Sequence, residues 1–121
     1  MSKIIYVVDN NDKTEYKYNI CEDTVIYHFS INSSSVVNVN LVTEGVTLHY
    51  YYNNINYDNN SFDINVKHMA DNTHSEVYNH GVNVKTAKLD YHVNGIVPKT
   101  SSKCICNQDN QIINMTDGKS T

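Results

Sequence analysis

Two of the three cysteines, Cys104 and Cys106, are separated by one residue near the C-terminal end of the sequence. On a regular strand, residues i and i+2 share a face and their Cα atoms lie about 6.6 Å apart, at the upper edge of disulfide geometry. Two thiolates on one face are also a ligand pair for a metal ion or an iron–sulfur cluster. The alternative is that both side chains fill one core-facing column as small apolar groups.

His68 is the histidine that we expect to accompany the cysteines in such a metal site. It ends an alternating run that places Phe62, Ile64 and Val66 on one face, and it falls on that same face. Its alternative role is that of a polar core group whose nitrogens are satisfied by the turn at residues 71–73. The remaining candidates lack metal-pair spacing, and we expect them on the surface: His74, His80 and His92.

The tyrosine run at residues 50–52 offers a possible binding surface. Because side chains alternate along a strand, Tyr50 and Tyr52 share one face and Tyr51 takes the other. An outward Tyr51, together with Tyr57, predicts an aromatic patch for a partner, either protein or carbohydrate. Ordinary strand packing is the alternative.

Motifs of enzymatic chemistry are missing from the sequence. It contains no Gly-x-Ser-x-Gly elbow, no phosphate-binding glycine loop, no dinucleotide-binding glycine set and no HExxH pair. Its carboxylates show no spacing that would pair them. We therefore predict a protein without catalytic activity.

Length and charge narrow the class of protein further. A chain of 121 residues with 40% hydrophobic and 18% charged residues is expected to form a single globular domain, 1–121. A net charge of −4 without clustered Lys and Arg argues against nucleic-acid binding. We read no signal peptide and no membrane span, and three cysteines do not suggest a disulfide framework, so we expect a cytoplasmic protein.

The apolar pattern along the chain has the period of β-strands throughout. Short alternating runs, stopped by Asn, Asp or Gly, cover residues 3–8, 15–20, 24–31, 35–42, 46–52, 62–69, 75–79, 82–84 and 88–93. No segment shows helical periodicity over ten residues. This predicts an all-β fold: a solenoid, a sandwich or a barrel. The runs 3–8 and 15–20 could pair as a hairpin, and the last run should bury Leu89, Tyr91 and Val93 and expose Lys88, Asp90 and His92.

The order of elements between residues 67 and 97 resembles the core of the SufB/SufD family of iron–sulfur cluster assembly proteins. The residues that carry the resemblance are His68, Asn72, Thr73, Ser75, Gly81, Val82, Tyr91, Gly95, Ile96 and Val97. The resemblance implies a right-handed parallel β-helix, a single-stranded solenoid, with the β-sandwich as the alternative. It also implies a SufD-like scaffold or accessory role, with iron or an iron–sulfur cluster as cofactor and other Suf components as partners. The family's helical flanks, where the SufC ATPase docks, have no counterpart here.

The C-terminal strands predict self-association. A solenoid must cover its last coil, and the polar residues after Met115 are too few to do so. We therefore expect a homodimer through residues 104–106 and 111–115, with Ile112, Ile113 and Met115 as contact residues. Two other functions stay open: a β-solenoid module that binds carbohydrate or protein, and a metal-binding protein that uses Cys104, Cys106 and His68.

Overall fold

The computed structural model describes residues 3–10, 13–84, 86–98, 102–116 and 119–120, with side chains described as far as Gln111. All regular structure in this part of the chain is β-strand. The strands are β1 (Lys3–Asn10), β2 (Lys13–Ile20), β3 (Thr24–Ile31), β4 (Ser34–Leu41), β5 (Thr47–Asn56), β6 (Asn60–His68), β7 (His74–Val84), β8 (Leu89–Ile96), β9 (Ile105–Thr116) and β10 (Lys119–Ser120). A search of the same residues finds no helix of the length and apolarity needed to cross a membrane.

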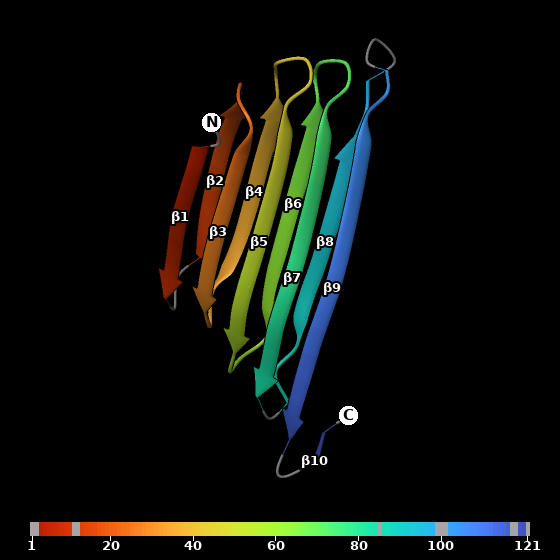
Figure 1. The fold of residues 1–121 in the computed structure, drawn as a ribbon. Helices are drawn as coiled ribbons and strands as arrows, with labels where there is room; N and C mark the ends of the chain where they lie inside the picture. Colours follow the sequence, from red (N-terminus) through yellow and green to blue (C-terminus); the bar gives the residue numbers. More distant parts are fainter. Residues whose placement is uncertain (1–2, 11–12, 85, 99–101, 117–118, 121) are drawn as a thin grey trace.

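The strands alternate between two sheets, so that the chain winds as a parallel β-solenoid (Figure 1). The odd sheet has the order β1-β3-β5-β7-β9-β10, and the even sheet has the order β2-β4-β6-β8. Every pair is parallel except β9 with β10, which run antiparallel over two residues. The predicted all-β solenoid is confirmed. The predicted hairpin of residues 3–8 with 15–20 is wrong, because β1 and β2 belong to opposite sheets and each pairs with the next coil instead.

The coils grow longer along the chain. In the odd sheet Lys3 pairs with Thr24, Thr24 with Leu48, Leu48 with Ser75, and Ser75 with Cys106, so successive coils contain 21, 24, 27 and 31 residues. Left-handed backbone at Asn32, Asn72 and Lys103 (φ 50°, 58° and 57°) makes some of the turns between strands. Asn tolerates this conformation, as expected from its frequent place at the ends of the runs.

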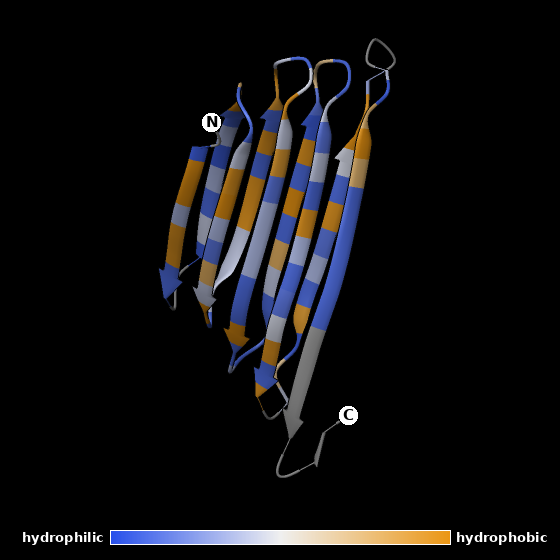
Figure 2. Ribbon diagram, in the orientation of Figure 1, coloured by the Kyte–Doolittle hydropathy of each residue, from blue (hydrophilic) through white to orange (hydrophobic). Residues whose placement is uncertain are grey.

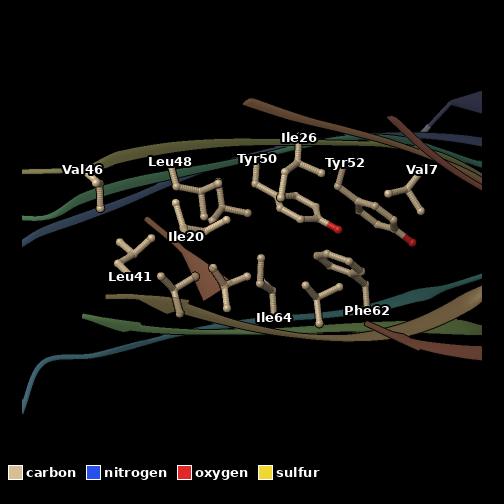
Figure 3. Close-up of a cluster of buried hydrophobic side chains, with 14 residues drawn as sticks. Val7, Ile20, Ile26, Leu41, Val46, Leu48, Tyr50, Tyr52, Phe62 and Ile64 are labelled. Carbon is tan, nitrogen blue, oxygen red and sulfur yellow. The ribbon is translucent and has the colours of Figure 1, made fainter. Parts of the chain in front are cut away.

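The core lies between the two sheets, where alternate residues of β1 to β8 point inward (Figure 3). Figure 2 shows this alternation as hydrophobic and hydrophilic residues changing places along the middle strands, whereas the coloured part of β9 is hydrophilic after its first residues. Tyr50, Tyr52 and Phe62 are the largest fully buried side chains. Tyr52 and Phe62 stack across the sheets with centroids 3.7 Å apart and thus tie the odd sheet to the even one.

The predicted register of β8 is correct, but its burial is incomplete. Leu89, Tyr91 and Val93 point inward, whereas Asp90 and His92 are exposed on the other side. The three inward side chains are only half-buried, because β8 pairs with β6 and is the last strand of the even sheet.

Candidate functional site

Four tyrosines form a ladder on the outward side of the odd sheet. Parallel pairing without stagger places Tyr6, Tyr27, Tyr51 and Tyr78 at equivalent positions of β1, β3, β5 and β7. Consecutive ring centroids lie 5.4, 5.3 and 4.8 Å apart with interplanar angles of 18°, 14° and 10°. The rings are therefore stacked along the solenoid axis, and the ladder follows directly from the register.

Apolar side chains flank the ladder on both sides and make it part of a larger surface. We call this surface the tyrosine face; besides the ladder it contains Ile4, Val8, Val25, Phe29, Ile31 and Ile55. Tyr6 and Val8 are each 69% exposed, which is unusual for large apolar side chains on neighbouring positions. A shallow groove of about 320 Å³ crosses the face between Phe29, Ile31, Ile55 and His80.

Charge is confined to one end of the tyrosine face. Among the described outward residues of β3, β5 and β7, Glu76 carries the one carboxylate, and it lies 3.1 Å from His49 Nδ1 and 3.6 Å from His74 Nε2. The Tyr78 hydroxyl donates to Glu76 at 3.0 Å, and this bond, together with the two imidazoles, lowers the pKa of Glu76. The face is thus uncharged over β3 and β5 and acidic at β7.

The stacking decides which partners the ladder suits. A sugar ring binds an aromatic side chain by covering its face, but here the faces of Tyr27 and Tyr51 are covered by neighbouring rings. The middle of the ladder therefore presents ring edges and hydroxyls, which are common contacts at protein interfaces. The sequence placed Tyr51 outward correctly. Tyr57 is exposed just beyond β5, six residues after Tyr51, and an aromatic patch shared by the two stays a prediction.

The structure brings His68 and Cys104 into one hydrogen-bonded cluster. His68 is fully buried; its Nδ1 lies 2.7 Å from Thr73 Oγ1 and its Nε2 lies 3.1 Å from Ser75 Oγ. Thr73 Oγ1 also lies 3.3 Å from Cys104 Sγ. The Thr73 hydroxyl therefore contacts both the imidazole and the thiol.

This arrangement fits a polar core anchor better than a ligand set for iron or a cluster. Both nitrogens of His68 are occupied by hydroxyls, and burial, with His74 nearby, lowers the pKa of His68. Cys106 is exposed one register position away, beside Ser75 on β7. Among the described residues, no group of three or more His, Cys, Asp and Glu side chains is placed to hold a metal ion. The metal role of Cys104, Cys106 and His68 remains a prediction.

A second buried polar cluster, near the first coil, escaped the sequence analysis. Asp9 Oδ2 accepts hydrogen bonds from His28 Nε2 at 2.6 Å and from Ser35 at 3.0 Å, and Asp9 Oδ1 accepts one from Tyr16. The Tyr50 hydroxyl lies 2.6 Å from His28 Nδ1 and completes the set. Asp9 follows Val7 in β1, which is a weak signal for an inward position, but His28 belongs to the mostly polar alternate set of β3, which the sequence does not mark as buried.

Ionisation in this cluster is set by burial and by the donors around Asp9. Burial alone would raise the pKa of Asp9, but the bonds from Tyr16, His28 and Ser35 outweigh it, and the pKa lies below 3.8. Burial lowers the pKa of His28 below 6.5, although Asp9 opposes the shift. The cluster therefore holds an aspartate and a neutral imidazole, and it links the first three coils inside the core.

The remaining predicted contact residues lie on β9. Its backbone pairs with β7 along the whole of that strand, but the side chains of Ile112, Ile113 and Met115 lie outside the described ones. Comparison with known proteins adds no further site: no family model, curated protein or solved structure matches the chain.

Proposed function

We propose that the protein is a non-catalytic scaffold that binds another protein through the tyrosine face. The single observation that carries the proposal is the stacked ladder of Tyr6, Tyr27, Tyr51 and Tyr78 within an apolar, largely uncharged surface. Contiguous exposed apolar surface of this kind is expensive to leave in water and is typical of interaction sites.

The partner that fits is a flat protein surface with apolar side chains. Aromatic residues are enriched at the centres of protein interfaces, where they supply area at a small cost in conformational entropy. The tyrosines here are held by each other before binding, so little side-chain order must be gained. The groove at Phe29, Ile31 and Ile55 gives the partner a place for one anchoring side chain.

Site-specific photo-crosslinking in the native cell tests this proposal. A benzophenone amino acid replaces Tyr6 on the tyrosine face or, as the matched control, Asn38 on the outward side of the even sheet. We expect a discrete protein adduct from position 6 and none from position 38. Equal labelling from both positions would contradict the proposal. Glycan binding that Tyr51→Ala abolishes would favour the carbohydrate alternative.

The resemblance to the SufB/SufD family supports a narrower form of the proposal, in which the partner belongs to the iron–sulfur assembly machinery. Two observations favour it. The parallel β-solenoid is the fold that the resemblance implies, and His68, one of the residues that carry it, contacts two others, Thr73 and Ser75, in the core. In this role the chain acts as a SufD-like accessory subunit in the cytoplasm.

Identification of the crosslinked protein tests the narrower form separately. A Suf component in the adduct from position 6 supports it, whereas an unrelated protein removes it and leaves the scaffold proposal intact. Anaerobic reconstitution with iron and sulfide tests the cofactor. If the protein with Cys104→Ser and Cys106→Ser takes up as much iron as the parent, the cysteines are structural.

A further inference from the structure

At the C-terminal end of the described solenoid, the odd sheet has one more strand than the even sheet. Among the described strands, the odd sheet has five coil strands, β1 to β9, and the even sheet has four, β2 to β8. Strand β9 therefore extends past the even sheet, and the outer edge of β8 has no partner among the described strands. Strand β10 pairs with Met115 and Thr116 alone, so it leaves the rest of the outer edge of β9 open.

Side-chain exposure marks the same gap. Phe62, Ile64 and Val66 of β6 are 0% exposed, whereas Tyr91 and Val93, their counterparts on β8, are half-buried. The inward residues of β9 are exposed, although the β7 residues with which they pair are buried: Cys106, Gln108 and Asn110. The interior is open at this end.

A second copy stacked head to tail does not close this gap. Its first coil brings one strand for each sheet, and the even sheet would still lack a strand opposite β9. A second copy turned by 180° about an axis parallel to the strands does close it. That rotation exchanges the odd and even sides, so the β9 of each copy lies beside the β8 of the other.

We propose that two copies of this chain join through such a reciprocal joint, with β8 of one copy antiparallel to β9 of the other. The contact is a closed two-fold interface, in which the same two strands of each copy are used. Each copy supplies the strand that the other lacks, and two unpaired strand edges per copy gain backbone partners.

The register of the joint follows from one close approach. Within a copy, a Cβ on Gly95 would lie 2.6 Å from Cys106 Sγ, so these residues occupy the same height along the strands. The rotation preserves height and therefore places Gly95 beside Cys106 of the second copy. Antiparallel pairing then sets Val93 beside Gln108 and Tyr91 beside Asn110, all pointing inward.

The outward side chains match in the same register. His92 falls beside Asp109 of the second copy, Asn94 beside Asn107, and Asp90 beside Gln111. No like charges face each other, and each pair can form a hydrogen bond or an ion pair. The alternation of inward and outward positions agrees on both strands, which a shift by one residue would destroy.

Joining in this way makes the scaffold bivalent. Because the rotation exchanges the two sides, the tyrosine faces of the two copies point in opposite directions. This consequence rests on the proposed function, whereas the joint itself does not.

Light scattering coupled to size exclusion, at tens of micromolar chain, tests the joint. We expect twice 13.8 kDa for the natural sequence. His92→Asp places two carboxylates together twice per dimer and should raise the dissociation constant about tenfold. Combining it with Asp109→Lys restores an opposite pair and should recover the affinity. Both side chains are exposed in the single chain, so folding should be retained, which circular dichroism checks.

Two results would overturn the joint. One is a monomer across this concentration range. The other is a dimer that His92→Asp does not weaken or that Asp109→Lys does not rescue, since either outcome places the interface elsewhere. A matched control, Asp63→Lys on the outward side of β6, should leave the dissociation constant unchanged. If the photoreactive residue at position 6 yields no protein adduct while light scattering still shows the dimer, the proposed function alone is refuted.

Discussion

On the outward sides of both sheets, parallel pairing without stagger aligns side chains of similar type. The aligned residues are apolar and aromatic on the odd sheet and polar on the even sheet. On the odd sheet, equivalent positions of β1, β3, β5 and β7 carry stacked tyrosines within apolar flanks. On the even sheet, which we call the asparagine face, they carry asparagines and charged residues. Asn65 donates to Asn38 at 3.1 Å and accepts from Asn94 at 2.9 Å, so these three residues form a chain of side-chain amides.

The difference shows that the same strand register can build either kind of ladder. The residue type at the aligned positions decides whether a face suits solvent or a partner. Parallel pairing without stagger lines up like with like on both sheets, and each ladder stabilises its coils. Asparagine ladders satisfy their own hydrogen bonds and leave further polar atoms for water. In the tyrosine ladder, neighbouring rings cover each other's faces, but the ring edges stay exposed to solvent. The asparagine face therefore suits solvent, and the tyrosine face suits a partner.

Removing the core between the faces should have the largest effect, because it damages both ladders at once. Phe62 stacks on Tyr52 at 3.7 Å and on Tyr91 at 5.8 Å and is fully buried. Phe62→Ala should lower the free energy of unfolding by about 3–5 kcal/mol in a urea titration. Phe62→Leu, which keeps most of the volume, should cost clearly less. Equal losses for the two variants would mean that packing volume does not hold the sheets together.

Acid should weaken both faces together through the Asp9–His28 cluster. Because the pKa of buried His28 lies below 6.5, the unfolded chain binds a proton before the folded chain does, and stability falls as the pH drops below 6.5. His68, whose pKa is also lowered, acts in the same direction. The pKa of Asp9 lies below 3.8, so its contribution is present above that value and is lost as the pH falls through the folded pKa.

Thermal unfolding between pH 7 and pH 3 measures this dependence. His28→Gln should flatten the dependence of the unfolding temperature on pH between pH 6.5 and pH 4. The part of the dependence that is due to His68 should remain. His80→Gln, at an exposed position, is the matched control and should keep the curve of the natural sequence. A curve that His28→Gln does not change would assign the acid sensitivity to other groups.

Strand identity, and the buried face of most strands, could be predicted from the sequence, because both depend on local alternation. Residues 62–68 show this, since Phe62, Ile64 and Val66 share the buried face. Residues 24–31 are an exception: the alternate apolar set Val25, Tyr27, Phe29 and Ile31 points outward. Sheet membership could not be predicted. The coils of 21, 24, 27 and 31 residues have no common period, so nothing in the sequence shows that β1 pairs with β3 rather than with β2.

The tyrosine ladder was hidden for the same reason. Tyr6, Tyr27, Tyr51 and Tyr78 are separated by unequal intervals and meet only once the register is known. Tyr51 was predicted to point outward, but its stacking partners Tyr27 and Tyr78 were not predicted. The Asp9–His28 pair joins two coils and was equally invisible. Sequence patterns therefore predicted the faces of most single strands, β3 excepted, and contacts between strands required the fold.

A single substitution in the middle of the tyrosine ladder should have an intermediate effect. Tyr51 stacks on Tyr27 at 5.3 Å and on Tyr78 at 4.8 Å. Tyr51→Ala removes both contacts and should cost about 1–3 kcal/mol of unfolding free energy. Tyr51→Phe keeps the rings and should cost little. If the two variants are equally destabilised, the hydroxyl rather than the stacking supports the ladder.

The smallest effect should come from the matching position of the asparagine face. Asn65, like Tyr51, lies between two residues of its own type and makes two ladder contacts. Its hydrogen bonds compete with water, because the side chain is on the surface, so Asn65→Ala should cost only about 0.5–1 kcal/mol. The same urea titration measures it, and Asn65→Asp should cost no less, since an ionised carboxylate cannot donate to Asn38.

The pair of substitutions separates stability from binding. Tyr51→Ala should weaken both folding and the crosslinked adduct at position 6, whereas Asn65→Ala should leave the adduct unchanged. An asparagine variant that abolishes the adduct would move the binding surface to the even sheet. Because both variants remove one central rung of a ladder, any difference in adduct yield at matched folded fraction reports which face touches the partner.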